Sequence, residues 1–222
     1  MSIVTRKLIA KELHVNRWFL AGAAAAAALS AFACSFGRAA FNIGGLTWLT
    51  TVIALGVMLA IYGVMHERKE RSLEFVLSLP LSVGEYVRAK MAGLLLCFLL
   101  PWLAATISAV LLVLADPDVA DGLLPYVLLL CAFLFANFAV VLCGAMHVTS
   151  EAAVAALIIV TNMFVSVFMF TVGALPELQK FMEGPVPVWN ATFWTVLAVE
   201  IAIFIIAITL PLLTAARRRD FI

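Results

Sequence analysis

The chain has 222 residues, of which 65% are hydrophobic and only 12% are charged, and its mean hydropathy is +1.14. A soluble domain of this length cannot bury so much apolar surface, so the composition excludes soluble enzymes and soluble binding proteins and predicts an all-α integral membrane protein. The formal net charge of +1 says little, because the positions of the charges along the chain carry the information.

The first 17 residues alternate basic and apolar side chains. Arg6, Lys7 and Lys11 are interspersed with leucines and isoleucines, a pattern typical of an amphipathic helix that lies in the membrane interface. The alternative is a signal peptide that is cleaved in the A-x-A sequence at residues 31–33. The basic region is long for a signal peptide and contains Glu12, so we expect this segment to be retained.

Six stretches are long enough to cross a bilayer, which requires about 20 apolar residues. Their approximate ranges are 18–36, 45–65, 90–114, 123–147, 151–174 and 192–216. If the N-terminus lies inside, Arg38 and Lys180 are the only two of the 14 Lys and Arg residues in outer segments. This positive-inside bias predicts that both termini, and the connection between the second and third spans, are cytoplasmic.

The connection at residues 66–90 is the longest charged interruption of the apolar sequence. Residues 67–78 are predicted to form a short amphipathic helix, because Leu73, Val76 and Leu77 share one helical face. Glu67 and Arg71 have the spacing of an i,i+4 ion pair. A helix of this kind, held in the cytosol between two spans, suits contact with a partner protein.

The same connection contains signals that divide it into two parts. Pro80 ends the first helix, since proline has no N–H and restricts the residue before it. Ser82 and Glu85 then form an S-x-x-E capping box that begins a new helix, which continues into the third span. We therefore expect residues 82–90 to connect the partner-facing helix to the membrane.

The outer connections are predicted at residues 37–44, 116–122 and 175–191. The last of these is the most structured, because Pro176–Met182 has the length and composition of one short helix and Pro185 and Pro187 favour an extended turn after it. The adjacent Trp189 suits the level of the lipid headgroups.

The sequence lacks the motifs of intrinsic catalysis. It contains no G-x-x-x-x-G-K-[ST] phosphate loop, no H-E-x-x-H and no G-x-S-x-G. The four cysteines fall in apolar segments without metal-ligand spacing, and the three histidines lie at predicted cytoplasmic edges. We expect no catalytic residue, no metal and no nucleotide bound to this chain.

Few polar residues fall within the spans. Glu200 is the ionisable residue placed well inside the hydrocarbon, and such residues are functional candidates because burying a charge there is costly. The alternative is a carboxyl that is protonated or paired near the outer interface. Asn137 and Asn162 are further candidates for an intramembrane polar site, although amides in spans more often hydrogen-bond between helices to stabilise packing.

Taken together, these features resemble the membrane subunits of ABC-2 type ABC exporters, across essentially the whole chain. The resemblance rests on the N-terminal TRKLIAKEL, the cytoplasmic ERKERSLEFVLSLPLSVGEYVRAK and the basic C-terminal RRRDF. The string E-x-x-x-x-S-L-E-F-x-L-S-L-P-L-S is the most specific of these. The haem-exporter permease of cytochrome c maturation is a related branch of similar size that shares this loop.

The resemblance implies a single permease domain over residues 1–222, with an interfacial helix at 1–17, a coupling loop at 66–90 and a re-entrant outer segment at 175–191. In this family the coupling helix docks on a separate cytosolic ATPase. The implied contact residues here are Glu67, Arg68, Glu70, Arg71, Leu73, Glu74, Phe75, Val76, Leu77 and Leu79.

The resemblance also implies the assembly and the activity. A second permease chain, most simply a second copy of this one, would complete the path in a bacterial inner membrane, and two ATPase subunits would hold ATP and Mg²⁺. The cargo would be hydrophobic or amphipathic, with membrane lipid as a neighbour and no role for nucleic acid. A membrane anchor or assembly factor that recruits an ATPase without transporting anything is the alternative function.

Overall fold

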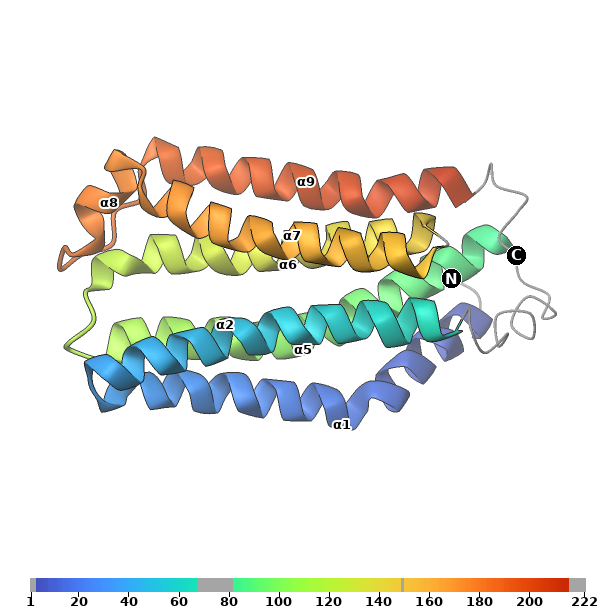
Figure 1. Ribbon diagram of the computed structural model, residues 1–222, viewed down its shortest axis with the longest axis horizontal. Coiled ribbons are helices and arrows are strands. Elements are labelled where there is room, and N and C mark those ends of the chain that lie inside the picture. Colours follow the sequence, from blue (N-terminus) through green and yellow to red (C-terminus); the bar gives the residue numbers. More distant parts are fainter. Residues whose placement is uncertain (1–2, 68–81, 149, 216–222) are drawn as a thin grey trace.

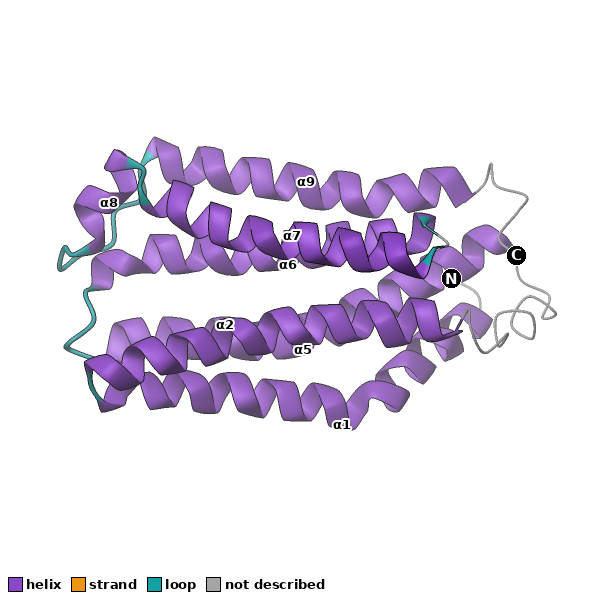
Figure 2. Ribbon diagram, in the orientation of Figure 1, coloured by secondary structure: helices purple, strands orange, loops and turns teal. Residues whose placement is uncertain are grey.

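The computed structural model describes residues 3–67, 82–148 and 150–215, which form helices and no strand (Figure 2). Long helices run side by side along one axis, and both termini lie at the same end of the bundle (Figure 1). The prediction of an all-α membrane protein with six spans is confirmed. Six helices are long and apolar enough to cross a membrane: Thr5–Phe36, Ala39–His66, Gly84–Ala115, Asp121–His147, Glu151–Gly173 and Ala191–Thr214.

The first helix, α1, runs from Ile3 to Ala33 and continues into a 3₁₀ turn, η1, at Cys34–Phe36. The sequence predicts an interfacial helix followed by a separate span, whereas the structure joins both in one helix. Residues 3–21 contain no glycine or proline that would break it. The N-terminal part, dark blue in Figure 1, nevertheless bends away from the axis of the rest.

The second span begins earlier than predicted. A turn at Gly37, whose φ of 102° is accessible mainly to glycine, leads directly into α2 at Arg38–Ala60. The outer connection expected at residues 37–44 is therefore helical from Arg38 onward, because that single turn residue reverses the chain. The span ends in a π-helical turn, η2, at Ile61–His66.

The central helices are α5 (Val83–Ala115) and α6 (Leu124–His147), which the 3₁₀ turn η3 (Asp121–Leu123) connects at the end of the bundle opposite the termini. Their contact is aromatic. Phe98 of α5 stacks on Phe138 of α6 with a distance of 4.2 Å between ring centroids. The indole N–H of Trp102 donates to the carbonyl of Cys131, at 2.8 Å.

The remaining helices are α7 (Glu151–Gly173), α8 (Pro176–Met182) and α9 (Ala191–Ala215). The short helix predicted between the fifth and sixth spans is confirmed as α8, which packs against η3 and α6 at the end opposite the termini (Figure 1). Whether this segment re-enters the bilayer stays a prediction.

The bundle has two groups of helices. In one, α1 packs closely on α5 and α2, and in the other, α6 packs on α9 and α7 (Figure 1). Contacts of α6 with α5 and α2 join the groups, and the fully buried Leu94, Leu129 and Leu142 lie in their common core. Much of α7 and α9 is apolar and exposed, as expected for surfaces that face lipid or another chain.

Candidate functional site at the end that holds both termini

A cluster of ion pairs joins three helices at the end that holds the termini. Lys90 Nζ of α5 lies 2.8 Å from Glu12 Oε1 of α1 and 2.7 Å from Glu67 Oε2, directly after η2. The other oxygen of Glu67 lies 2.8 Å from Lys11 Nζ. The Tyr86 hydroxyl also donates to Glu67 Oε2, at 3.1 Å. We call these five residues the charge cluster.

The charge cluster sits where the chain enters and leaves residues 68–81. Glu67 is the last described residue before that segment, and α5 begins just after it. The Glu67–Lys90 pair therefore holds the two ends of the segment together, and the Lys90–Glu12 pair ties both ends to α1. These contacts therefore connect the helices on both sides of the segment to α1.

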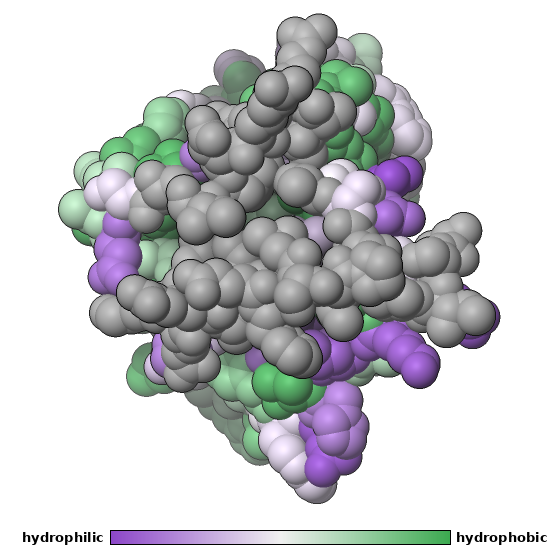
Figure 3. Space-filling model, turned by 90° about the vertical axis from the view of Figure 1, so that its right-hand side faces the viewer, coloured by the Kyte–Doolittle hydropathy of each residue, from purple (hydrophilic) through white to green (hydrophobic). Residues whose placement is uncertain are grey.

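The cluster is buried although it contains four charges. The side chain of Lys90 is only 4% exposed and that of Glu12 10%, whereas Lys11 is 47% exposed. Two ammonium groups balance two carboxylates, which is the condition under which charges are tolerated away from water. Figure 3, which views this end, shows hydrophilic residues among hydrophobic ones on the described surface.

Burial and the neighbouring charges shift the pKa of Glu67 in opposite directions. Burial alone raises the pKa of this carboxyl, but the ammonium groups of Lys90 and Lys11 outweigh burial and hold the pKa below its usual value of 4.5. Glu67 thus stays ionised in the folded protein at a pH where the unfolded chain already binds a proton.

This shift predicts an acid-sensitive contribution to stability. Because the folded pKa of Glu67 is lowered, its contribution is complete above about pH 4.5 and is lost as the pH falls through the folded pKa. We expect wild-type protein to lose its stability advantage over Glu67→Gln as the pH falls below about 4.5, the usual pKa of the carboxyl. Unfolding measured at a series of pH values in one detergent tests this, and a difference that stays constant below this pH would contradict it.

Small residues and an irregular turn make the cluster possible. A Cβ on Gly93 would lie 2.9 Å from Glu12 Cγ, so glycine is what lets α1 approach α5 at this level. The π turn at η2 shifts the helical register just before Glu67. Such turns are rare and occur frequently at functional sites.

The start of α5 has the geometry of a complete capping box. The backbone N–H of Glu85 donates to Ser82 Oγ at 3.2 Å, and the backbone N–H of Ser82 donates to Glu85 Oε2 at 3.0 Å. This reciprocal cap fixes the first turn of α5 directly after residues 68–81.

Most of the proposed partner-contact residues lie outside the described residues, and so does Pro80. Among them Glu67 is described, and its carboxylate faces Lys90, Lys11 and Tyr86 at 15% exposure. The Glu67–Arg71 pair also involves an undescribed residue and stays a prediction. The remaining residues outside the described ranges are Arg68, Glu70, Leu73, Glu74, Phe75, Val76, Leu77 and Leu79.

The structure does not bring the three intramembrane candidates together. Asn137 and Asn162 line a small cavity between α2, α5, α6 and α7, and Glu200 is not among its lining residues. The amide expected to bridge helices bonds its own helix instead, since Asn162 Nδ2 donates to the carbonyl of Ile158 at 2.8 Å. The side chain bonds its own helix rather than a neighbouring one because the carbonyl four residues earlier is within its reach.

Glu200 lies in a different environment, where α5, α6 and α9 meet. It is 4% exposed, and neither carboxylate oxygen has a hydrogen-bond partner among the described residues. The Cys131 thiol interacts with the Thr106 hydroxyl and is within electrostatic range of Glu200. Glu200 follows Ala191 by nine residues, so it lies about 13 Å along α9 from that end.

Because the Glu200 carboxylate has no hydrogen-bond partner among the described residues, we predict that Glu200→Gln does not destabilise the protein. An ionised carboxylate here would be buried without a partner, which is costly, and glutamine keeps the shape without the ionisable group. We expect the free energy of unfolding to change by less than about 1 kcal/mol or to rise. Chemical denaturation of the purified variant measures this, and a loss of several kcal/mol would indicate a partner for the charged form.

Sequence reasoning missed the pairing of one acid and one base at this end of the bundle, Glu12 and Lys90. Glu12 and Lys90 are 78 positions apart, yet their side chains form a buried pair. The available signal was an acid in a basic amphipathic helix and a lysine within the apolar start of the third span. Neither position identifies the other, because the contact depends on how α1 lies against α5.

Comparison with known proteins adds one positive finding. A family model described as "ABC-2 family transporter protein" matches residues 7–212, which include the charge cluster and all six spans except two residues at the start of the first and two at the end of the last. The search of curated proteins finds no match.

Proposed function

Because this chain belongs to the ABC-2 transporter family and is a multi-pass permease subunit of an ABC transporter, we propose that it is the membrane subunit of an exporter. Its residues 67–79 dock on a separate cytosolic ATPase, which binds and hydrolyses ATP with Mg²⁺ in two copies. This chain supplies the path and the mechanical linkage, and carries no catalytic residue of its own.

The observation that carries this proposal is the charge cluster. Ion pairs at 2.7 Å and 2.8 Å link both ends of the segment 68–81 to each other and to α1. A docked ATPase that moves this segment would therefore move α1, α2 and α5 together. Their combined motion would change access to the path between the two sides of the membrane.

The orientation follows from charge. The end that holds both termini carries the charge cluster, and six of the eight Lys and Arg residues in the described ranges lie toward it, so we place this end on the cytoplasmic side of a bacterial inner membrane. The ATP-binding partner is then on the same side as the docking segment. Export of a hydrophobic or amphipathic cargo fits a bundle whose described surface is almost wholly apolar between its two ends.

A second permease chain is part of the proposal. Six helices of one chain form a packed core here, with Phe98, Phe138 and Leu94 filling the centre. A wide path therefore has to lie between chains. The exposed apolar face of α7, which includes Met163, Phe164 and Phe170, is available for lipid or for such a contact.

Docking is tested by placing a charge on the apolar face of the coupling segment. We expect Leu73→Asp or Leu77→Asp to abolish co-purification with the ATPase, because an unpaired carboxylate in a protein interface is costly. Ser78→Asp is the matched control, since Ser78 projects to the opposite face of a helix through these residues. Equal recovery of the ATPase with Leu73→Asp and Ser78→Asp would refute the docking site.

Transport itself needs a separate measurement. Vesicles that contain the permease and the ATPase should move a fluorescent amphiphile when ATP is added on the ATPase side. Stable binding of the ATPase without any ATP-dependent movement of amphiphiles would favour the anchor function instead.

A further inference from the structure

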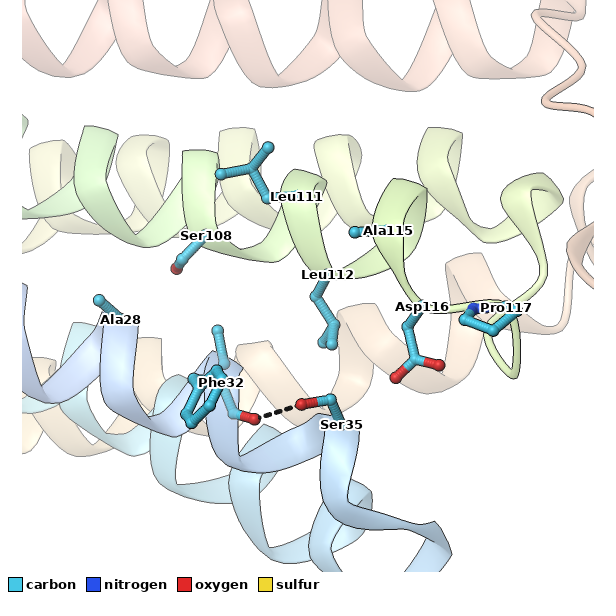
Figure 4. A pocket seen from close by; sticks show the side chains of 10 residues that line it. Ala28, Phe32, Ser35, Ser108, Leu111, Leu112, Ala115, Asp116 and Pro117 are labelled. Atoms are coloured by element: carbon cyan, nitrogen blue, oxygen red, sulfur yellow. Dashed lines mark hydrogen bonds between the residues drawn. The ribbon is translucent and has the colours of Figure 1, made fainter.

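A groove of about 570 Å³ lies between α1 and α5 at the end opposite the termini (Figure 4). Each helix contributes residues at i, i+3, i+4 and i+7, so the two linings face each other along about 10 Å of helix. One side is lined by Ala28, Ala31 and Phe32 of α1 and by Ser35 of η1, and the other by Ser108, Leu111, Leu112 and Ala115 of α5.

The groove exists because the facing side chains are small. Elsewhere α1 packs closely on α5, but the alanines and serines at this level leave the space between the helices unfilled. Phe32 and Leu111 flank it and are 64% and 58% exposed. In a bilayer, a hydrocarbon wall that is open on one side is in contact with lipid chains.

The hydroxyls of the lining do not make the wall polar. Ser35 Oγ donates to the carbonyl of Phe32 at 2.7 Å, and Ser108 Oγ donates to the carbonyl of Ala105 at 2.8 Å. Both side chains therefore use their hydrogen on their own helix. The body of the groove is suited to an apolar chain.

One end of the groove carries a charge. Asp116 follows the last residue of α5 and lies beside Ser35 at the mouth, as Figure 4 shows. It is half-buried, accepts the backbone N–H of Asp118 at 3.0 Å, and forms no ion pair with a cation among the described side chains. The connection that follows contains two further acids, Asp118 and Asp121, which do not line the groove.

We propose that this groove binds one acyl chain of a membrane lipid whose headgroup carries an ammonium group, such as phosphatidylethanolamine, and that Asp116 holds this group. The volume lies within the range of ligand sites, about 300–1,000 Å³. Its length covers about two-thirds of one leaflet, whose hydrocarbon is about 15 Å thick. The order of an apolar wall and then a carboxylate matches the order of chain and headgroup in the leaflet.

The acidic residues at this end of the groove favour a lipid over a second copy of the chain as the bound partner. In a two-fold contact the same patch meets itself, so a seam along this groove would bring the acidic connections of both copies to one interface. The ammonium group of a lipid headgroup can instead pair with the carboxylate at the membrane surface. The site is independent of the ATPase, so its test does not depend on the proposed transport function.

The test uses the full-length permease in vesicles of phosphatidylglycerol that contain a small fraction of phosphatidylethanolamine with a photoactivatable acyl chain. After illumination, mass spectrometry should locate the label on peptides that contain residues 28–35 and 108–117. Ala28→Phe fills the groove and should abolish this label. Ala21→Phe places the same ring on α1 at an exposed position outside the groove and should leave the label unchanged.

Two matched substitutions test whether Asp116 binds the headgroup. Asp116→Asn should reduce the preference for phosphatidylethanolamine over photoactivatable phosphatidylglycerol by about two- to fivefold, as expected for one interfacial charge pair. Asp118→Asn makes the same charge change outside the lining and should keep the preference. Equal labelling by both lipids regardless of Asp116 would overturn the proposal in favour of ordinary boundary lipid, and crosslinks between two chains at these residues would overturn it in favour of a protein seam.

Discussion

Replacement of Lys90 with methionine is expected to destabilise the permease by about 3–5 kcal/mol, the usual cost of removing one partner from a buried ion pair. Glu12 and Glu67 would then face each other with no cation between them, and the side chain of Glu12 is only 10% exposed. Glu67 would keep Lys11, whereas Glu12 would lose the ion pair that ties it to α5.

The matched control is Lys11→Met, which removes the same charge from the same cluster. Lys11 is 47% exposed, and a solvated pair contributes at most about 1 kcal/mol. Unfolding of both variants in mixed detergent micelles measures the difference. Similar small losses for Lys90→Met and Lys11→Met would contradict a buried cluster.

A second substitution separates stability from coupling. Lys90→Met combined with Glu12→Met removes the stranded carboxylate and places two apolar side chains in contact, so most of the lost stability should return. The link between the coupling segment and α1 would still be missing. We therefore expect the double variant to bind the ATPase but to hydrolyse ATP without movement of cargo.

Gly122→Ala is expected to destabilise the outer end of the bundle by about 3 kcal/mol, at the upper end of the usual cost of overpacking. A Cβ at this position would lie 1.9 Å from the carbonyl oxygen of Phe181 and 2.8 Å from that of Gly184. Both atoms belong to the backbone and cannot turn aside. The change also threatens the hydrogen bond that Gly122 N donates to Gly184 O at 2.9 Å.

Gly45→Ala is the control for this substitution, because a Cβ on Gly45 meets nothing within 4 Å. Within α2 the alanine should be neutral or should stabilise the protein by up to about 1 kcal/mol, since glycine is a poor helix former. Thermal unfolding of the two variants compares them directly. Wild-type stability of Gly122→Ala would mean that α8 does not rest on this turn.

The local sequence pattern predicts one part of the candidate site, the capping box, but not the other part, the buried ion pairs. Ser82 and Glu85 are three residues apart, and the hydrogen bonds of a capping box depend only on that spacing and on the helix that follows. Pairing Glu12 with Lys90 needs the relative position of two helices. The i,i+4 rule offered Arg71 as the partner of Glu67, and it has no access to a lysine 23 residues away.

The sequence by itself determined that this is a six-span helical membrane protein, because an apolar stretch of about 20 residues crosses a bilayer as a helix that satisfies its own backbone hydrogen bonds. It also determined the short outer helix α8, which its proline and its length specify. Only the tertiary structure decided which charges are buried together at Lys90, which polar residues stand alone, as Glu200 does, and where small residues leave a groove beside Asp116. The reason is that periodicity assigns each residue to a face of its own helix, whereas the partner of that face depends on how helices distant in the chain pack against one another.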